Sequence, residues 1–198
     1  MSAVLQIAST LGQVGRLLDR LGERVLAWDE AALAWVSEHP FFRRIDGLLV
    51  LSTYLGDGYI WGLLALYLIL FGTPYDHRNV LISLAVLMVE ITVFRLFKAL
   101  FARPRPALAE HAQTSRMLAL DIHSFPSGHA TIAFGIAYLI AFFYPAWPNV
   151  LLSYLVAGLI ALSRVYLKEH YPMDVIGGAI LGTLVSYVLA PLFCALIH

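Results

Sequence analysis

The sequence predicts an all-α fold: a polytopic transmembrane helical bundle of about five spans, preceded by an N-terminal amphipathic helix at the membrane interface. Its composition is the first reason, because 60% of the 198 residues are hydrophobic and 13% are charged, against roughly 45–50% and 25% in soluble domains. The second is the presence of five apolar stretches close to the roughly 20 residues that a membrane-spanning helix needs. They run near Leu48–Phe71, Asn79–Phe101, Ala130–Trp147, Val150–Leu167 and Val175–Ile197.

The composition also excludes several classes of protein. Thirteen Lys and Arg balance thirteen Asp and Glu, so no net positive field attracts a nucleic acid, and we expect none as a partner. The single cysteine, Cys194, permits no disulfide within the chain and no cysteine-based metal site. So hydrophobic a chain is not disordered. We therefore expect an integral membrane protein that has the lipid bilayer as its surroundings.

Residues 2–40 differ from the spans. Apolar residues recur there at helical spacing, and charged residues fill the opposite face: Arg16, Asp19, Arg20, Glu23 and Arg24. Charges through its middle exclude a membrane span and the apolar core of a signal peptide. We expect an amphipathic helix on the membrane surface; the alternative is a soluble helix packed on the rim of the bundle. The chain thus divides into an N-terminal interfacial segment, residues 1–44, and a transmembrane domain, residues 45–198.

The links between the five spans are short and rich in turn-forming residues, with one exception. The loop Ala102–Pro126 has about 25 residues, and long loops in compact proteins are often functional. Its histidines, His111 and His123, are expected to be ordinary interfacial residues. In the last span, Gly178 and Gly182 form a small-xxx-small pattern, which lets another helix approach closely.

Polar residues gather in three clusters at the ends of the spans. The first runs from Lys98 to Pro106, the second from Phe125 to His129, and the third from Ser163 to Asp174. Consecutive spans alternate in direction, so one membrane face holds four of the span ends: the end of the second, the start of the third, the end of the fourth and the start of the fifth. The clusters are therefore predicted to form one site, and charges placed at such cost usually mark function.

The residue types in the clusters suit a phosphate ligand. Lys98, Arg105 and Arg164 supply three positive charges with little acid nearby, and guanidinium groups match phosphate oxygens with paired donors. Ser127 precedes a predicted helix and is expected to be its N-cap. The exposed amides of Ser127 and Gly128, at the positive end of the helix dipole, complete an anion site.

Two histidines and an aspartate add the groups that phosphoryl transfer requires. Pro172 suits the first turn of the fifth span, which places Asp174 in that turn and within reach of His170 just before it. A carboxylate on one imidazole nitrogen fixes the tautomer and leaves the other nitrogen free to attack. His129 supplies a second imidazole for proton transfer.

With these residues the chain resembles the type 2 phosphatidic acid phosphatase family, which is related to the vanadium-dependent haloperoxidases. The family signature is Lys-x6-Arg-Pro, then Pro-Ser-Gly-His, then Ser-Arg-x5-His-x3-Asp. It falls here on Lys98 to Pro106, Pro126 to His129 and Ser163 to Asp174, and no signature position is substituted. The resemblance covers roughly residues 45–195.

The resemblance implies a membrane phosphatase acting on a polyprenyl pyrophosphate, phosphatidylglycerol phosphate, phosphatidic acid or a lipid A phosphate, with the loop 102–126 helping to choose among them. It implies that His170 attacks phosphorus and forms a phosphohistidine, that His129 protonates the leaving group and then activates water, and that Asp174 orients His170. No metal ion or cofactor is implied, because basic and backbone groups hold the phosphate oxygens: Lys98, Arg105, Ser127, Gly128 and Arg164.

Three alternatives belong to other classes. A lipid phosphotransferase would use the same site to pass the phosphoryl group to an acceptor other than water. Haloperoxidases share the oxyanion site, but they are soluble and larger than this chain. A non-catalytic scaffold or transporter is disfavoured by the intact His129, His170 and Asp174.

Three further polar residues lie close to the signature. For Arg103 we favour contact with lipid phosphates over steering of a headgroup. Glu90 lies inside the second span on one helix face with Lys98; we favour a structural polar contact over tuning of Lys98. Asp57, between two glycines of the first span, either contacts a residue of the site or caps a break in the helix.

Two arguments disagree on the side of the membrane. Apart from the signature residues, the site side carries eight basic residues: Arg16, Arg20, Arg24, Arg43, Arg44, Arg103, Arg116 and Lys168. The other side carries Arg78 alone. The positive-inside rule therefore places the site in the cytoplasm. Many bacterial relatives in the resembled family face the periplasm, and basic residues that hold lipid headgroups inflate the count. We favour the periplasmic face of a multi-pass inner-membrane protein; the sequence predicts no oligomeric state.

Overall fold

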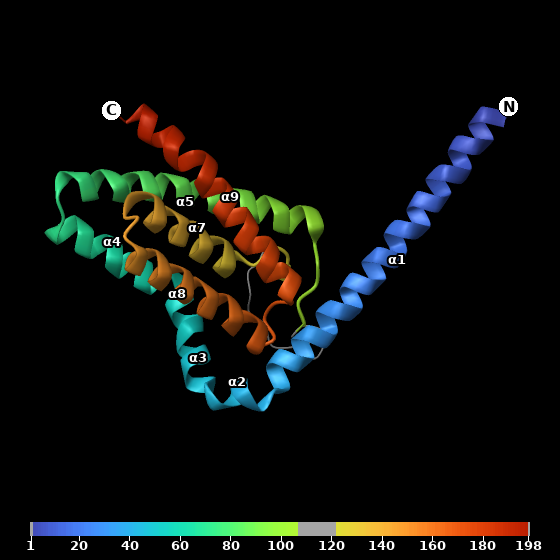
Figure 1. Cartoon of the computed structure of the whole chain (residues 1–198), viewed down its shortest axis with the longest axis horizontal. Coiled ribbons are helices and arrows are strands. Elements are labelled where there is room, and N and C mark those ends of the chain that lie inside the picture. The colour runs from blue at the N-terminus through green and yellow to red at the C-terminus, as the bar shows by residue number, and fades with distance from the viewer. Residues whose placement is uncertain (1, 107–121, 198) are drawn as a thin grey trace.

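A computed structural model gives the fold and describes residues 2–106 and 122–197. Regular structure within these residues is helical, which confirms the predicted all-α class. The elements follow the chain in this order (Figure 1): α1 (Ser2–Glu38), α2 (Pro40–Arg44), α3 (Asp46–Tyr54), a π-helical turn (Leu55–Tyr59), α4 (Ile60–Phe71), α5 (Pro74–Phe101), α7 (Gly128–Phe143), α8 (Trp147–Tyr166) and α9 (Pro172–Leu196).

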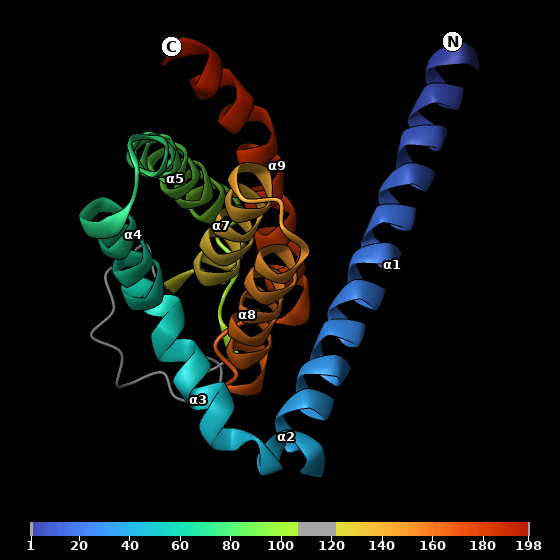
Figure 2. The same cartoon turned by 60° about the vertical axis from the view of Figure 1, so that its left-hand side comes forward.

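The short helix α7 lies in the middle of the bundle and packs against α5, α8 and α9. Helix α3 packs on α8, while α4 contacts α5. Helix α1 contacts α8 and α9 near its C-terminal end and diverges from the bundle toward its N-terminus (Figure 1, Figure 2). The predicted N-terminal helix is thus present as one long helix, and its place on a membrane surface stays a prediction.

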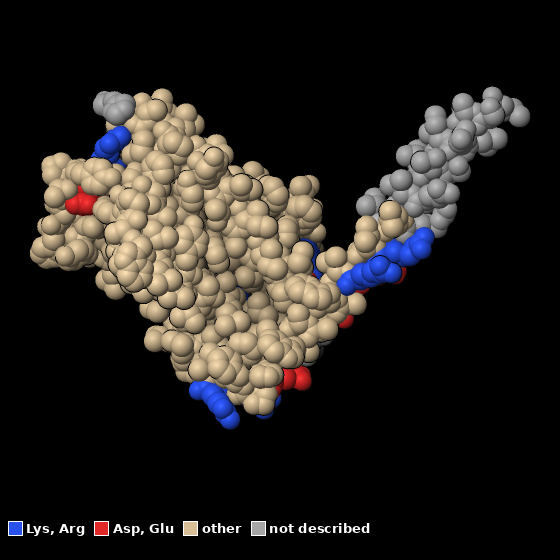
Figure 3. Space-filling model, viewed as in Figure 1, with Lys and Arg blue, Asp and Glu red and all other residues tan. Residues whose placement is uncertain are grey.

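Four helical segments are long and apolar enough to cross a membrane: Asp46–Phe71, Pro74–Phe101, Trp147–Tyr166 and Pro172–Leu196. The third expected span corresponds to α7, which is apolar but shorter, so the number of five spans stays a prediction. In Figure 3 charged residues lie toward the margins of the described surface, and a broad face between them carries no Lys, Arg, Asp or Glu. Such a face suits contact with lipid tails.

The two glycines of the small-xxx-small pattern allow the predicted close approach of another helix, which is α7. A Cβ atom at Gly178 would lie 2.5 Å from the carbonyl oxygen of Ser127, and one at Gly182 would lie 2.0 Å from that of Thr131. Real side chains do not approach a backbone so closely. The absence of side chains at both positions therefore fixes the start of α7, and with it the second cluster, against α9.

Glu90 makes the structural contact that we favoured. Its side chain is fully buried and accepts a hydrogen bond of 2.6 Å from the Ser186 hydroxyl of α9. A Cβ atom at Gly135 would lie 2.2 Å from the Glu90 Oε1 atom, so this glycine makes room for the carboxylate. The contact joins α5, α7 and α9 inside the bundle.

The first expected span is interrupted by the π-helical turn Leu55–Tyr59. Gly58 there has φ +105°, a left-handed conformation that glycine adopts without steric cost. A Cβ atom at Gly56 would lie 2.8 Å from Ile160 and 2.9 Å from His129. Gly58 therefore allows the backbone turn, and Gly56 lets the turn approach α7 and α8 closely. Asp57 lies between them, and π-turns often mark functional positions.

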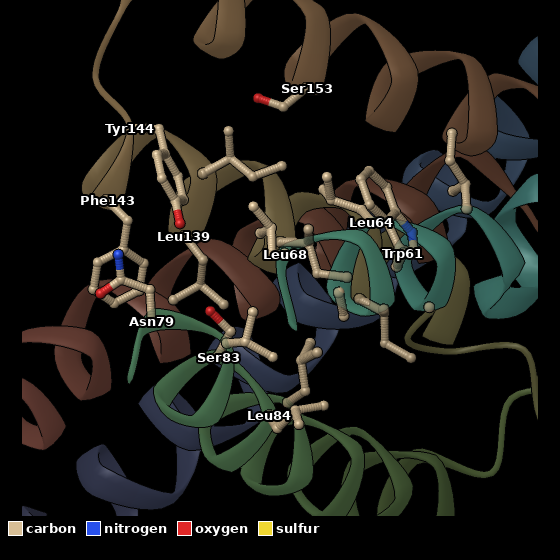
Figure 4. A pocket seen from close by; sticks show the side chains of 18 of the residues that line it. Trp61, Leu64, Leu68, Asn79, Ser83, Leu84, Leu139, Phe143, Tyr144 and Ser153 are labelled. Atoms are coloured by element: carbon tan, nitrogen blue, oxygen red, sulfur yellow. The ribbon is translucent and has the colours of Figure 1, made fainter. Parts of the chain in front are cut away.

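An apolar cavity of about 640 Å³ lies between α4, α5, α7 and α8. Gly58 lines it, so the cavity borders the interrupted turn. Figure 4 shows Leu64, Leu68 and Leu139 among its walls, with a few polar side chains such as Asn79. A space of this kind suits a hydrocarbon chain.

Candidate active site

The first cluster lies where α5 ends. Lys98 is buried in the last turn, with its Nζ atom 5.9 Å from the centre of the Phe94 ring. Ala102, with φ +46°, ends the helix in a left-handed conformation and turns the chain toward α9. A Cβ atom at Gly128 would lie 3.1 Å from that same Phe94 ring, so Phe94 places Lys98 beside the start of α7.

The second cluster forms the start of α7. Ser127 is the N-cap, and its hydroxyl accepts a hydrogen bond from the Ala130 N–H, as predicted. The Ser127 N–H was expected to be exposed for an anion, and this is wrong: it donates to the carbonyl oxygen of Asp174, at 2.9 Å, because the start of α7 packs on α9. Gly128 and His129 follow as the first two helical residues. The positive end of this helix therefore lies directly beside the first turn of α9.

The third cluster is the tight turn from α8 to α9. The N–H groups of Glu169 and His170 both donate to the carbonyl oxygen of Arg164, at 3.0 and 3.1 Å. Lys168 adopts φ +56° to allow the turn. Helix α9 begins at Pro172, as expected. The Asp174 Oδ2 atom accepts the Tyr171 N–H at 2.9 Å, so the carboxylate faces back toward the turn.

His170 is the buried centre of this arrangement, with 1% of its side chain exposed. Its Nδ1 atom lies 3.7 Å from Asp174 Oδ2, within ion-pair distance but longer than a hydrogen bond. Burial, together with the charges of Arg105 and Arg164, lowers the pKa of His170 to about 3. The imidazole is therefore neutral at physiological pH, the form in which it can act as a nucleophile.

The two predicted phosphate-binding arginines meet at one carboxylate. Arg105 donates to Glu169 Oε2 at 2.6 Å, and a terminal nitrogen of Arg164 lies 3.5 Å from the same oxygen. Arg164 is held from α3 by the Thr53 hydroxyl, at 3.1 Å. The Glu169 side chain is 30% exposed, so it can leave the two guanidinium groups for water, as their predicted role in phosphate binding requires.

Two contacts at the site involve residues outside the signature, one left open by the sequence and one predicted wrongly. His129 Nε2 lies 2.8 Å from Asp57 Oδ1, which decides the question left open for Asp57 in favour of a contact with the site. Arg103, expected to contact lipid phosphates, instead binds two buried carboxylates, those of Asp29 and Asp174. The flanking glycines drew attention to Asp57, whereas nothing in the local sequence singled out Asp29.

The structure thus brings residues of all three clusters together at one end of the bundle. The catalytic candidates are His170, His129 and Asp174, and the phosphate-binding candidates are Lys98, Arg105, Ser127, Gly128 and Arg164. His111 and Arg116, like most of the long loop, lie outside the described residues. Among the described residues, no group of three or more His, Cys, Asp or Glu side chains is arranged to hold a metal ion.

Comparison with known proteins supports one family. The family model described as the PAP2 superfamily matches residues 79–195. Undecaprenyl-diphosphatase BcrC of Bacillus subtilis is 29% identical over 147 residues, which are 73% of this chain and 72% of that protein. The putative undecaprenyl-diphosphatase YbjG of Escherichia coli is 34% identical over 149 residues, 75% of this chain and 69% of that protein.

Solved structures show the same fold. The crystal structure of Aquifex aeolicus LpxE superimposes with a TM-score of 0.61 at 27% identity, covering 81% of this chain and 93% of that one. A PAP2-type phosphatidylglycerolphosphate phosphatase from Bacillus subtilis superimposes with a TM-score of 0.64 at 24% identity, covering 88% of each chain. Because this second structure is only 24% identical to the chain, its similarity is evidence for the fold alone.

Proposed function

The chain belongs to the PAP2 superfamily and is a multi-pass membrane phosphatase of lipid phosphates; from that premise we propose that it hydrolyses a polyprenyl pyrophosphate through a phosphohistidine on His170. The relatives support this substrate, since proteins similar in sequence to this chain include ones named undecaprenyl-diphosphatases. Phosphatidylglycerol phosphate, phosphatidic acid and lipid A phosphates are the competing substrates.

One observation carries the mechanism: a neutral, fully buried imidazole stands beside two guanidinium groups and a carboxylate. The low pKa of His170, about 3, leaves a ring nitrogen unprotonated for attack at phosphorus. Arg105 and Arg164, now joined through Glu169, bind the phosphate oxygens, with Lys98 and the Gly128 N–H at the start of α7. Such preorganised donors are usually the largest contribution to catalysis, and basic groups supply it here.

The reaction then proceeds in two displacements. In the first, a nitrogen of His170 bonds to the terminal phosphorus and the bond from phosphorus to the bridging oxygen breaks, while His129 gives its proton to that oxygen. In the second, His129 takes a proton from water, whose oxygen attacks the phosphohistidine and releases inorganic phosphate and free His170. Asp174, 3.7 Å from Nδ1, stabilises the positive charge of the phosphorylated ring.

Asp57 has the complementary role at His129. Its carboxylate lies 2.8 Å from Nε2 and stabilises the imidazolium that protonates the leaving group, against the repulsion of Arg164 and Arg105. It also fixes which ring nitrogen carries the proton. Asp57 is thus a positioning residue for the proton-transfer histidine.

The apolar cavity supports a substrate with a long hydrocarbon chain. It borders Gly58, the neighbour of Asp57, and continues between helices of the membrane-spanning bundle (Figure 4). A lipid whose phosphate occupies the site can extend its tail along these walls. The pyrophosphate and the chain would then be bound by two different parts of one molecule.

The test is phosphate release by the purified full-length protein in detergent. Polyprenyl pyrophosphate, the corresponding monophosphate, phosphatidylglycerol phosphate, phosphatidic acid and a lipid A phosphate are compared in the presence of a chelator. We expect fastest release from the polyprenyl pyrophosphate, full loss in His170→Ala, and no change in His77→Ala, a control histidine at the other end of α5. Faster release from another lipid would refute the substrate, and activity in His170→Ala would refute the nucleophile. Transfer to an added alcohol in place of water would favour the phosphotransferase alternative.

We propose that the site faces the periplasm, as in many bacterial members of the family, although the positive-inside count favours the cytoplasm. The test uses the Cys194→Ser protein with one new cysteine at either end of the bundle, Glu38→Cys near the site or His77→Cys far from it. Labelling of intact cells with a membrane-impermeant maleimide should modify Glu38→Cys alone. Labelling of His77→Cys alone would place the site in the cytoplasm.

A further inference from the structure

We propose that Asp29 and Arg103 act as one positioning pair that holds the carboxylate of Asp174, so that the N-terminal helix α1 completes the active site. The inference rests on the proposed phosphohistidine mechanism and adds two residues that lie outside the catalytic signature. It also assigns a function to the segment 1–44 that its amphipathic pattern did not suggest.

Arg103 bridges two carboxylates from opposite ends of the sequence. One terminal nitrogen donates to Asp174 Oδ1 at 2.7 Å, and the other donates to Asp29 Oδ2 at 2.5 Å. Its guanidinium also lies over the Tyr171 ring, with Cζ 4.3 Å from the ring centre. Both carboxylates are fully buried, and the forked shape of a guanidinium suits two such acceptors at once.

Asp29 has a second contact that links it to the same turn. Its Oδ1 atom accepts the Met173 N–H at 2.9 Å. This N–H lies in the first turn of α9, where backbone donors have no acceptor within their own helix, and the N-cap residue Tyr171 offers no side-chain hydrogen bond. Asp29 therefore caps α9 from another helix, one residue before the catalytic carboxylate.

These contacts fix both oxygens of Asp174. Arg103 binds Oδ1, and the Tyr171 N–H binds Oδ2, the oxygen that faces His170. Without Arg103, Oδ1 would be buried without a partner beside the second negative charge of Asp29. The two carboxylates would repel each other, and Asp174 would turn away from the ring whose positive charge it must stabilise. The expected result is slower phosphorylation of His170 with unchanged substrate binding.

The simpler reading is that the pair only fastens α1 to the bundle. The two roles differ in what they predict for kinetics. If the pair is only structural, its removal lowers the fraction of folded protein and leaves the turnover of the folded fraction unchanged. If the pair positions Asp174, its removal lowers kcat of the folded protein. Its two members then act as a unit, so the effects of their substitutions do not multiply.

The experiment uses the full-length protein in detergent with polyprenyl pyrophosphate and a chelator. The variants are Arg103→Gln, Asp29→Asn, the double variant, and Arg103→Lys. Glu30→Gln is the matched control, because Glu30 is the next residue of α1, is exposed and carries the same charge. Asp29→Asn keeps an acceptor for the Met173 N–H and removes only the charge that faces Arg103.

We expect Arg103→Gln to lower kcat by about 10–100-fold, the range found when partners that orient a ligating or catalytic group are removed. KM should stay unchanged. Asp29→Asn should lower kcat in the same direction, the double variant should be no slower than Arg103→Gln, and Arg103→Lys should regain part of the loss. In rapid-quench experiments with labelled substrate, the rate of phosphohistidine formation should fall by the same factor as kcat.

The outcomes separate this inference from the proposed function. A wild-type kcat in folded Arg103→Gln and Asp29→Asn would overturn the inference. A loss of kcat that only follows the folded fraction, measured by thermal unfolding, would also overturn it, as would effects on kcat that multiply in the double variant. If Arg103→Gln does not fold, Arg103→Lys and Asp29→Asn decide by the same criteria. Failure of the wild-type protein to release phosphate, or activity in His170→Ala, would instead contradict the proposed function.

Discussion

Replacing Asp57 with asparagine tests whether His129 needs a carboxylate partner to transfer protons. The amide keeps the size of the side chain, but it has no negative charge. It can also present its NH₂ group to Nε2 of His129, which moves the ring proton to the other nitrogen. The substitution should therefore weaken proton donation to the leaving group and leave the nucleophile, His170, untouched.

The size of the effect follows from the exposure of the pair. General acid–base catalysis contributes about 10²–10⁴-fold to a rate. The Asp57 and His129 side chains are 44% and 24% exposed, so water screens part of their 2.8 Å contact. We therefore expect Asp57→Asn to slow hydrolysis of a polyprenyl monophosphate, whose leaving group is a strongly basic alkoxide, by about 10–100-fold. The pyrophosphate releases a more stable phosphate ester, so its phosphorylation step should slow by only about threefold.

The assay is rapid-quench measurement of phosphohistidine formation and decay with both labelled lipids. In Asp57→Asn the pyrophosphate should phosphorylate the enzyme almost normally, and the phosphohistidine should then accumulate, because the step that needs a base for water is also slowed. Asp46→Asn is a control, since Asp46 binds the Tyr166 hydroxyl outside the site. Equal slowing of both lipids, or no accumulation, would refute the assignment of proton transfer to His129 and Asp57.

Three further predictions concern charge, packing and pH. Glu169→Gln should tighten the binding of orthovanadate, a phosphate mimic, by about tenfold, because the oxyanion no longer displaces a carboxylate from Arg105 and Arg164. The affinity is measured by titrating inhibition with orthovanadate, and an unchanged affinity would show that Glu169 does not compete with the oxyanion. Gly182→Ala should lower the melting temperature in detergent, since its Cβ would lie 2.0 Å from a backbone oxygen of α7, while Gly62→Ala, where a Cβ meets nothing within 4 Å, should not. Burial lowers the pKa of His170 to about 3 from 6.5, so the unfolded state binds one more proton between these two pH values. The free energy of unfolding therefore falls as the pH falls from 6.5 to 3, by up to about 1.4 kcal/mol per pH unit. Unfolding curves of His170→Gln at several pH values should lack this part of the pH dependence, and an unchanged slope would contradict the prediction.

The sequence was sufficient for the parts of the site that depend on local chemistry. Ser127 caps α7 and Pro172 opens α9 as predicted, because capping preferences act within a few residues. The convergence of the three clusters could also be predicted, since alternation of the spans constrains where their ends lie. The shortness of α7 could not, because hydropathy continues to Trp147 while the helix already ends at Phe143.

The contacts that the sequence left open or missed join residues far apart in the chain. Asp57 meets His129 across 72 positions, and Asp29 meets Arg103 across 74. No periodic pattern encodes such pairs, which depend on how α1 and the interrupted turn before α4 pack on the rest. The amphipathic pattern of α1 suggested a surface helix, and it gave no means of predicting that one acidic residue would become fully buried.

Charge alone also could not separate the roles of the arginines in the sequence Arg-Pro-Arg. Arg103 and Arg105 are two residues apart, and each binds carboxylate. The difference lies in the partners: Asp29 and Asp174 are fully buried, whereas Glu169 is 30% exposed. Breaking a buried pair costs about 3–5 kcal/mol, while an exposed carboxylate can return to water at little cost. Arg103 is therefore held in the buried structure around His170, whereas Arg105 binds a carboxylate that can return to water, as its proposed role in phosphate binding requires.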